Sequence, residues 1–324
     1  MIKLPRFEDL TIQFAHKAYD FLDEFAGRNT GIKYFQTFTR EETKARLGET
    51  DVLVLSGFWQ NDFLELTPRL RYIQAISAGY NYMDTDAIKA RSIILSNAGG
   101  VNSNAVSEQA FALLLGLTRR LHLARDDQAN RYWRGMGSGM SEREEELPGK
   151  TMLIVGLGNI GARTANLARA FSMKTIGIKR NTQGFEHLVD EIYTTSTLSE
   201  HLPRADVVVL TCPLTEETAN LIDAAAFGLM KNDAYFINVA RGGCVDQSAL
   251  IQALQENRLA GAGIDTFEVE PLPESSPLWG LKNAILTSHT AGETRAYERN
   301  IVDQLLENLN RLSNGADKLI NRIV

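Results

Sequence analysis

The most constraining feature of this sequence is a G-x-G-x-x-G segment at residues 156–161. A short apolar run, 151–155, precedes it, and a stretch with apolar residues at helical spacing, 159–171, follows it. Glycines in this context permit a tight turn, let the backbone approach a pyrophosphate and let a helix pack closely on a strand. The N-terminus of that helix attracts phosphate charge. The segment therefore predicts a dinucleotide-binding turn made by Gly156, Gly158, Asn159, Ile160 and Gly161, although an ordinary strand-to-helix turn has the same local pattern.

Short runs rich in valine and isoleucine alternate along the chain with segments of helical periodicity, which is typical of buried parallel strands joined by helices. This alternation predicts an α/β fold with doubly wound parallel sheets of the Rossmann or flavodoxin kind. The length of 324 residues favours two domains. Before about Asp51 the pattern is unclear. The predicted strands are 51–57, 70–76, 92–97, 151–155, 175–179, 206–211, 234–239, 261–267 and 284–289, and the clearest predicted helices are 159–171, 247–257 and 293–313.

A long helix is expected from Ser103 or Asn104 to about Leu123. Its alanine, leucine and phenylalanine residues lie on almost every side, so we expect it to be buried between domains or between subunits. A loop rich in glycine, serine and glutamate then leads to Lys150, where we place the entry to the second domain.

Composition narrows the class of protein. The net charge of −6 argues against a sequence-independent nucleic-acid binder, which needs a basic face. The two cysteines, Cys212 and Cys244, are too few for a disulfide framework or a metal knuckle, so we expect free buried thiols in a reducing compartment and no metal site. The N-terminal residues lack the apolar stretch of a secretory signal, and the sequence has no run of about 18 apolar residues that would span a membrane. We therefore expect a cytoplasmic protein.

The residues after the second predicted strand of the cofactor domain bear on cofactor choice. NAD sites normally carry an acidic residue there, about 20 positions after the glycines, which binds the ribose 2′-hydroxyl. Here Lys179 and Arg180 occupy the matching positions. Because cations attract a 2′-phosphate, the sequence predicts a preference for NADP(H), with NAD(H) still possible. The alternative is that both are solvated surface cations at the end of a strand.

Three further segments place ionisable side chains where predicted strands end: 238–243 with Arg241, 263–273 with Asp265 and Glu270, and 287–292 with His289. The carboxyl ends of parallel strands face the ligand crevice, so these side chains are expected to converge. Taken singly, each also has an ordinary interpretation, as an ion-pair partner, a surface carboxylate or a buried histidine.

In these motifs and their order, the sequence resembles the D-isomer-specific 2-hydroxy acid dehydrogenases from about Asp51 to about Arg311. Segments 77–81, 102–108 and 212–218 share in the resemblance. It implies a homodimer of two-domain chains. In each chain a cofactor domain, 102–292, would be inserted into a catalytic domain made of 1–101 and 293–324. It also implies a nicotinamide-dependent oxidoreductase that interconverts a small 2-oxo acid and its D-2-hydroxy acid.

The resemblance further implies roles for individual residues. His289 would exchange a proton with the substrate oxygen, Glu270 would orient the imidazole and keep it protonated for reduction, and Arg241 would bind the substrate carboxylate. The backbone amides of Ala78 and Gly79 would also hold that carboxylate. The residues implied in cofactor binding outside the glycine turn are Lys179, Arg180, Cys212, Pro213, Thr218, Val239, Ala240, Asp265, His289 and Gly292, with Asp265 on the nicotinamide amide.

Several points stay open at this level. Ser288 and Thr290 replace the proline and the aliphatic residue that often flank the histidine in this family, and no regulatory domain is expected after residue 324. Phe58, Trp59 and Phe63 either line a pocket for a bulky apolar 2-oxo acid or pack in the core, and glyoxylate or hydroxypyruvate is the alternative substrate.

Two other functions remain in view. The retained acid/base residues argue against a relative acting on an acid such as formate. A non-enzymatic protein that senses dinucleotide redox state is the main alternative.

Overall fold

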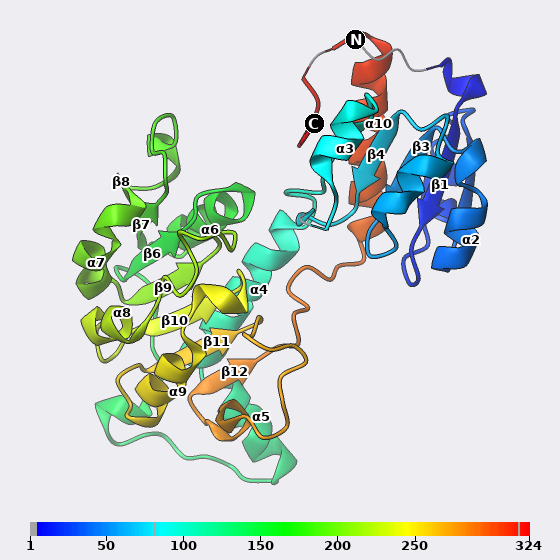
Figure 1. Ribbon diagram of the computed structural model, residues 1–324. Helices are drawn as coiled ribbons and strands as arrows, with labels where there is room; N and C mark the ends of the chain where they lie inside the picture. Colours follow the sequence, from blue (N-terminus) through cyan, green and yellow to red (C-terminus); the bar gives the residue numbers. More distant parts are fainter. Residues whose placement is uncertain (1–4, 81, 317) are drawn as a thin grey trace. The chain divides into compact units, whose positions relative to one another are not determined.

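The computed structural model describes residues 5–80, 82–316 and 318–324. The chain forms two compact units, the first made of Met1–Asn102 with Thr294–Val324 and the second of Ser103–Glu293. Each unit is built on its own sheet. In each sheet neighbouring β-strands pair in parallel, and helices cover both faces (Figure 1). The predicted α/β fold with doubly wound parallel sheets is therefore confirmed.

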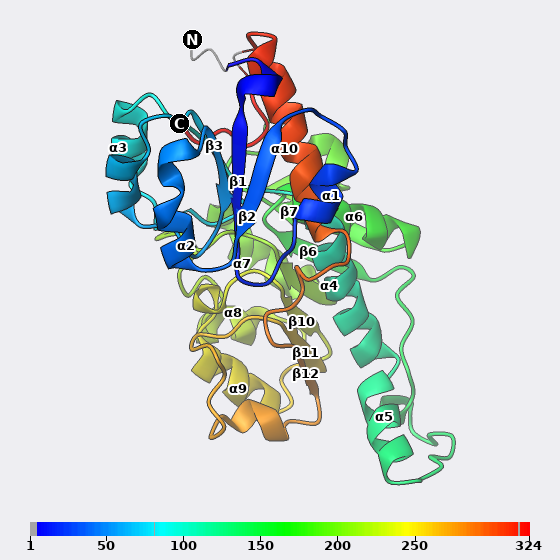
Figure 2. The same cartoon turned by 90° about the vertical axis from the view of Figure 1, so that its right-hand side faces the viewer.

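The first unit has the strand order β2-β1-β3-β4-β5, which is the flavodoxin type. Side chains of β3 alternate between two apolar clusters, because successive residues of a strand point to opposite faces. Helices α1 and α10 cover one face, and α2 and α3 cover the other (Figure 2). The elements are β1 Thr11–Ala15, α1 Leu22–Ala26, β2 Lys33–Thr37, α2 Arg40–Ala45, β3 Val52–Leu55, β4 Tyr72–Ala75, α3 Thr85–Ala90, β5 Ile94–Ser96 and α10 Tyr297–Ser313.

The second unit has the strand order β12-β11-β10-β9-β6-β7-β8. From β8 to β11 this is the Rossmann order, 3-2-1-4-5-6, and β12 adds a seventh strand. The order reverses between β6 and β9, so the ligand crevice is expected at the carboxyl ends of these two strands. The elements are α4 Ser103–Thr118, α5 Leu121–Ala129, β6 Thr151–Val155, α6 Asn159–Ala170, β7 Lys174–Ile178, β8 Glu191–Tyr193, α7 Leu198–His201, β9 Val207–Leu210, α8 Ala224–Leu229, β10 Tyr235–Asn238, α9 Gln247–Gln255, β11 Gly261–Ile264 and β12 Ala284–Leu286.

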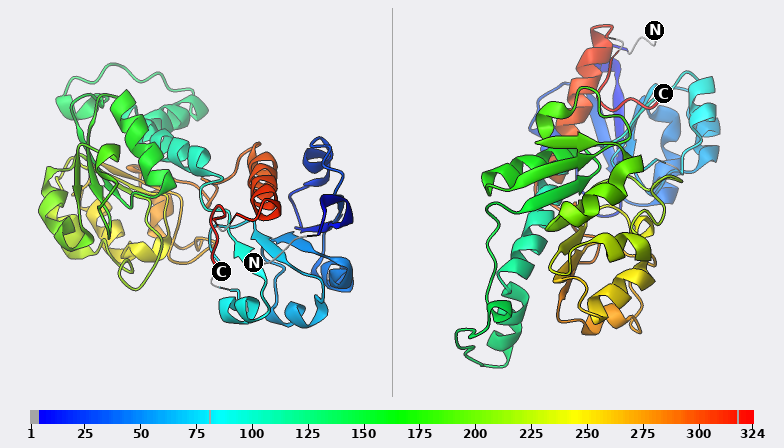
Figure 3. Two further views of the ribbon diagram at one scale, coloured as in Figure 1. Left: turned by 90° about the horizontal axis from the view of Figure 1, so that it is seen from above. Right: turned by 90° about the vertical axis from the view of Figure 1, so that its left-hand side faces the viewer.

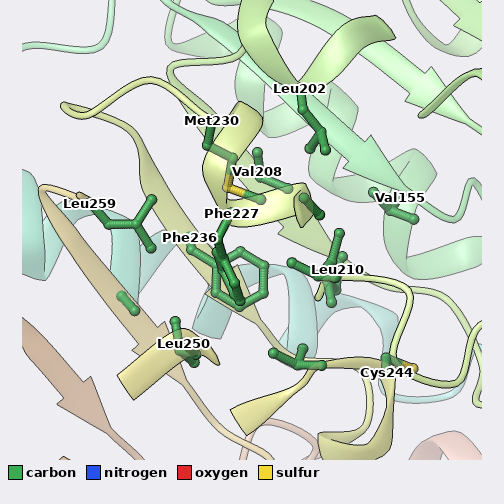
Figure 4. Packing of buried hydrophobic residues seen from close by; sticks show 14 of the residues in the cluster. Val155, Leu202, Val208, Leu210, Phe227, Met230, Phe236, Cys244, Leu250 and Leu259 are labelled. Carbon is green, nitrogen blue, oxygen red and sulfur yellow. The ribbon is translucent and has the colours of Figure 1, made fainter. Parts of the chain in front are cut away.

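The core of the second unit has two halves, one on each face of this sheet. In β9, Val208 and Leu210 join the cluster beneath α8 and α9, while Val207 and Val209 join the cluster beneath α4 and α6. Figure 4 shows the first cluster, where Phe227 of α8 packs edge-on against Phe236 of β10 with ring centroids 5.3 Å apart. A sheet buried on both faces keeps its strand ends fixed, which is what a site at those ends requires.

The structure corrects several expected elements. The predicted helix from Ser103 to Leu123 is two helices, because Arg120 adopts a left-handed conformation (φ +52°) and α5 begins after it. Strands β1, β2 and β8 were not predicted. Trp59 and Phe63 belong to the buried core of the first unit, so the core interpretation holds for them, and only Phe58 is partly exposed.

Among the described residues, none of the helices combines the length and apolar sequence that crossing a lipid bilayer demands.

Candidate active site

The glycine turn lies between β6 and α6, at the reversal of strand order. Gly156 has φ +100°, and a Cβ placed on it would come within 2.7 Å of the Cys212 Cα. A Cβ on Gly161 would lie 1.9 Å from the carbonyl oxygen of Gly156, so helix and turn could not pack as they do. Gly158 differs, because no atom lies within 4 Å of its Cβ position. Packing thus requires Gly156 and Gly161, whereas Gly158 leaves the backbone open to a ligand. Asn159 and Ile160 follow it and form the first turn of α6.

A cleft of ≈ 300 Å³ opens beside this turn, between the carboxyl ends of β6, β7 and β9. It suits a dinucleotide because glycine backbone lies at the helix N-terminus and both apolar and polar side chains line the rest. The predicted cofactor residues that line it are Gly156, Gly158, Lys179, Arg180, Cys212, Pro213 and Thr218. Among the described residues, the lining does not include Asn159, Ile160 and Gly161 of the turn itself. It also does not include Val239, Ala240, Asp265, His289 and Gly292, which lie after β10, β11 and β12.

Two positively charged side chains, Lys179 and Arg180, lie at the end of β7. The Lys179 ammonium is 3.3 Å from the Leu157 carbonyl oxygen and 4.1 Å from the centre of the Phe185 ring. Arg180 is largely exposed, with its Nη1 3.7 Å from the carboxylate of Glu217 across the cleft. The end of β7 itself carries no acidic residue in positions 178–181.

The predicted catalytic residues follow three adjacent strands, β10, β11 and β12. The His289 Nδ1 lies 2.7 Å from Glu270 Oε2, and Glu270 Oε1 accepts a 2.9 Å hydrogen bond from the Phe267 amide. Burial works to raise the pKa of Glu270, but the hydrogen bonds from His289 and Phe267 outweigh it and hold the pKa below its ordinary value. A carboxylate can only accept, so Nδ1 carries the proton of this bond and Nε2 is left to exchange a proton with a substrate.

Arg241 follows β10 and is exposed. Its Nη1 donates to the Ala240 carbonyl at 2.7 Å. The buried Asn238 side chain fixes the loop by accepting from the Ala240 amide at 3.0 Å and donating to the Arg241 carbonyl at 3.3 Å. The guanidinium charge is also one cause of the lowered pKa of Glu270, which places Arg241 electrostatically in the same cluster as the histidine–carboxylate pair.

Asp265 is buried and bonds to the segment that carries His289. Its Oδ1 accepts from the Thr287 hydroxyl at 2.6 Å and from the Thr290 amide at 3.0 Å, and its Oδ2 accepts from the Ala291 amide at 3.1 Å. Sequence reasoning assigned Asp265 to the nicotinamide amide, which stays a prediction, and it missed this second set of partners. Asp265 and Thr287 are 22 residues apart in the sequence. The one sequence signal for their contact was that both are polar residues at the ends of predicted strands.

A hollow of ≈ 760 Å³ adjoins the histidine–carboxylate pair. Its wall is largely apolar and includes Phe267, Leu272, Trp279 and Leu286. Thr287, Ser288 and Thr290 line it as well, so the hollow beside the His289–Glu270 pair has both an apolar and a polar side.

In the first unit, Ala78 and Gly79 lie in the loop after β4, and both are exposed. The Asn97 amide group donates to the Ala78 carbonyl at 2.6 Å, and the Ser77 hydroxyl donates to the Gly79 carbonyl at 2.7 Å. The backbone N–H groups of Ala78 and Gly79 donate to no other described residue. They are thus able to donate to an anion, while Asn81 of the same motif lies outside the described residues.

Cys212 and Cys244 are both free and buried, as expected from the sequence. Cys212 packs against the glycine turn and lines the cofactor cleft. The neighbouring Cys244 thiol and burial together raise the pKa of Cys212, which stays a neutral, apolar wall of the cleft.

Comparison with known proteins agrees with this geometry. Residues 111–291 match the family described as "D-isomer specific 2-hydroxyacid dehydrogenase, NAD binding domain". A glyoxylate reductase of Aeropyrum pernix is 33% identical over 87% of this chain and 85% of its own. A glyoxylate/hydroxypyruvate reductase B of an Enterobacter species is 36% identical over 78% of each chain.

Among solved structures, an acyclic imino acid reductase in complex with NADPH and D-Arg superposes with a TM-score of 0.80 at 26% identity, covering 97% of this chain and 100% of that one. The family match spans the glycine turn, the cleft and the histidine–carboxylate pair, and supports a nicotinamide dinucleotide as cofactor. The chain thus belongs to the D-isomer specific 2-hydroxyacid dehydrogenase family and is an enzyme of that class.

Proposed function

We propose that this enzyme reduces a small 2-oxo acid, either glyoxylate to glycolate or hydroxypyruvate to D-glycerate, and that it prefers NADPH. The observation that carries the proposal is the 2.7 Å bond between His289 Nδ1 and Glu270 Oε2. It lies at the carboxyl ends of the same sheet that bears the glycine turn. A paired, oriented imidazole at that edge is suited to proton transfer next to a dinucleotide.

Each residue then has a task. A bound nicotinamide dinucleotide supplies the hydride that reaches the oxo carbon. His289 gives the proton from Nε2 to the oxo oxygen, and Glu270 holds the ring by Nδ1 and balances its charge. Arg241 binds the substrate carboxylate, because its planar fork can make two parallel hydrogen bonds. The amides of Ala78 and Gly79, in the first unit, are proposed as neutral donors for a carboxylate.

A small substrate is supported by packing and by the relatives. Trp59 and Phe63 are committed to the core of the first unit, so neither is available to line a pocket for a bulky side chain. The curated relatives reported above carry the names glyoxylate reductase and glyoxylate/hydroxypyruvate reductase. Glyoxylate has no side chain at all, and hydroxypyruvate has only a hydroxymethyl group.

The test is the oxidation of NADPH and of NADH, followed by nicotinamide absorbance, with glyoxylate, hydroxypyruvate, pyruvate and a branched 2-oxo acid. We expect turnover with the first two substrates and faster turnover with NADPH. His289→Gln should lower kcat/KM by about 10²- to 10⁴-fold, because proton transfer is removed, while NADPH still binds at the glycine turn. Tight cofactor binding without turnover of any oxo acid would contradict the proposal and favour a redox sensor.

We also propose that the chain is a homodimer joined through α5 and the loop after it, residues 121–142, here called the arm. No residue of α5 is buried, and Trp133 and Met136 are 93% and 102% exposed. Figures 2 and 3 show the arm extending away from the sheet of its own unit. Monomeric proteins rarely expose such an apolar surface, so a second copy of the chain is its proposed occupant.

A further inference from the structure

A short chain of side-chain hydrogen bonds lies beneath the histidine loop. Gln109 Nε2 of α4 is 3.4 Å from Thr287 Oγ1, and Thr287 Oγ1 is 2.6 Å from Asp265 Oδ1. An ionised carboxylate only accepts and an amide NH₂ only donates. The direction of the chain is therefore fixed: Gln109 donates to Thr287, and Thr287 donates to Asp265. The threonine hydroxyl thus links α4 to this buried carboxylate.

Asp265 in turn holds the backbone on both sides of His289. Its carbonyl oxygen accepts from the His289 amide at 2.8 Å, and its carboxylate accepts from the amides of Thr290 and Ala291. Asp265 is only 1% exposed, so water cannot replace a donor that is lost. The orientation of this carboxylate thus decides the path of the loop.

That path is an unusual one. His289 has φ +56°, a left-handed conformation that residues with a Cβ seldom adopt. Such a conformation persists where surrounding contacts over-determine it. It is also the conformation in which His289 Nδ1 reaches Glu270 at 2.7 Å.

We propose that Thr287 is a positioning residue for the reaction. Its hydroxyl orients the Asp265 carboxylate, the carboxylate holds the left-handed backbone at His289, and that backbone keeps Nδ1 on Glu270. Without the hydroxyl, the Asp265 carboxylate loses its shortest hydrogen bond and is held only by amides of the loop that it positions. The loop then relaxes and the imidazole shifts away from Glu270. The kinetic part of this inference rests on the proposed reductase activity; the structural part does not.

The first test compares Thr287→Val, which removes the hydroxyl at nearly constant shape, with Thr287→Ser, which keeps it. Thr287→Val should lower kcat for glyoxylate reduction by on the order of 10- to 100-fold, because a misplaced catalytic group loses about that much. The KM for NADPH should change by less than kcat, since the cleft at the glycine turn is untouched and only the predicted contact of Asp265 with the nicotinamide amide is disturbed. Thr287→Ser should restore kcat. Equal kcat in Thr287→Val and wild type would overturn the proposal.

Thr118→Val is the matched control, because it deletes another buried hydroxyl of the same unit, one whose hydrogen-bond partner among the described residues is the Leu114 carbonyl within α4. It should leave kcat unchanged even if it lowers Tm. A similar kcat loss in Thr118→Val would mean that general loosening, and not positioning, explains the effect. If Thr287→Val does not fold, Thr287→Ala removes the same hydroxyl and takes its place.

The second test does not need turnover. The chain has five histidines, so ¹⁵N-histidine NMR at one fixed pH resolves their rings, and His289→Gln identifies the signals of His289. We expect Thr287→Val to shift the ring nitrogens of His289 and to leave the other four rings in place, and Thr287→Ser to match wild type. Unmoved His289 signals in Thr287→Val would refute the positioning role. An inactive wild type with the expected shift would instead refute only the proposed substrate.

Discussion

At the scale of single residues, charge at the end of β7 is the clearest determinant of cofactor choice. A ribose 2′-hydroxyl is normally bound there by a carboxylate, whereas this chain presents Lys179 and Arg180. The only acidic side chain lining the described part of the cleft is Glu217, which lies opposite and near Arg180. A 2′-phosphate would give Arg180 a second anionic partner on its own side of the cleft.

Removing both cations should reverse this preference. We expect the double variant Lys179→Ala/Arg180→Ala to lower kcat/KM for NADPH by about 10- to 100-fold, because charge-assisted hydrogen bonds to the phosphate are lost. The value for NADH should change by less than about 3-fold, since NADH has no phosphate there. Lys174→Ala, at the exposed start of the same strand, is the control and should alter neither value. Equal losses with both dinucleotides would show that these cations do not recognise the 2′-phosphate.

The sequence shows the identity of these residues more readily than their partners. Lys179 could be placed at a strand end from its spacing after the glycines, and the same reasoning put Arg241, Glu270 and His289 at strand ends. It could not show that Lys179 lies over Phe185, because a loop of unpredictable path joins them. Nor could it show that Asp265 bonds to Thr287, because that contact depends on the pairing of β11 with β12.

At the scale of elements, the glycines in the turn between β6 and α6 are needed for two different reasons, which the sequence pattern alone does not distinguish. Packing requires Gly161, since any Cβ there would meet the Gly156 carbonyl. Gly158 has a negative φ of −85° and open space around its Cβ position, so alanine fits there in the absence of a ligand. The first reason concerns the fold and the second concerns the approach of a pyrophosphate.

Two alanine substitutions should therefore have different effects. Gly161→Ala should lower Tm by several degrees, because overpacking by one methyl group costs about 1–3 kcal/mol in a tight site. Gly158→Ala should leave the Tm of the free protein unchanged and weaken NADPH binding by about 10-fold or more, as the methyl group blocks close backbone approach. Thermal unfolding and fluorescence titration measure the two effects. A Gly158→Ala protein that binds NADPH normally would mean that the cofactor does not contact this turn.

Strands were predicted correctly from the sequence where all of their residues are buried. Strands β3, β9 and β10 are apolar on both faces, so their runs are visible without other information. β1 was missed because it contains Gln13, which is fully buried only because Thr37, Thr43 and Thr50 satisfy it. β2 was missed because it is an edge strand with exposed residues, and β8 because its sequence, Glu191–Tyr193, holds a single aliphatic residue and no apolar run. The break between α4 and α5 was missed because no glycine or proline lies at the residues between the two helices.

At the scale of the whole molecule, the two units differ in how completely they bury their own apolar residues. α10 of the first unit returns late in the sequence and covers its sheet with Ile301, Leu305 and Leu309 fully buried. α4 of the second unit is similarly covered by its neighbours, which explains why its sequence is apolar on almost every side. The arm, residues 121–142, carries the two most exposed large apolar side chains among the described residues, Trp133 and Met136, which its own unit does not cover.

Association through the arm explains this exposure and makes a direct prediction. Wild type should sediment as a particle of twice the chain mass of 36.0 kDa. The double variant Trp133→Ser/Met136→Ser should shift toward monomer at the same concentration, because the contact loses its two most exposed apolar side chains, and buried apolar area drives association. Leu229→Ser removes an exposed leucine of α8, outside the arm, and should remain dimeric.

Sedimentation equilibrium over a range of concentrations distinguishes these outcomes. A wild-type protein that stays at the chain mass throughout would leave the arm without its proposed partner, and a dimer that the double variant leaves intact would place the interface elsewhere.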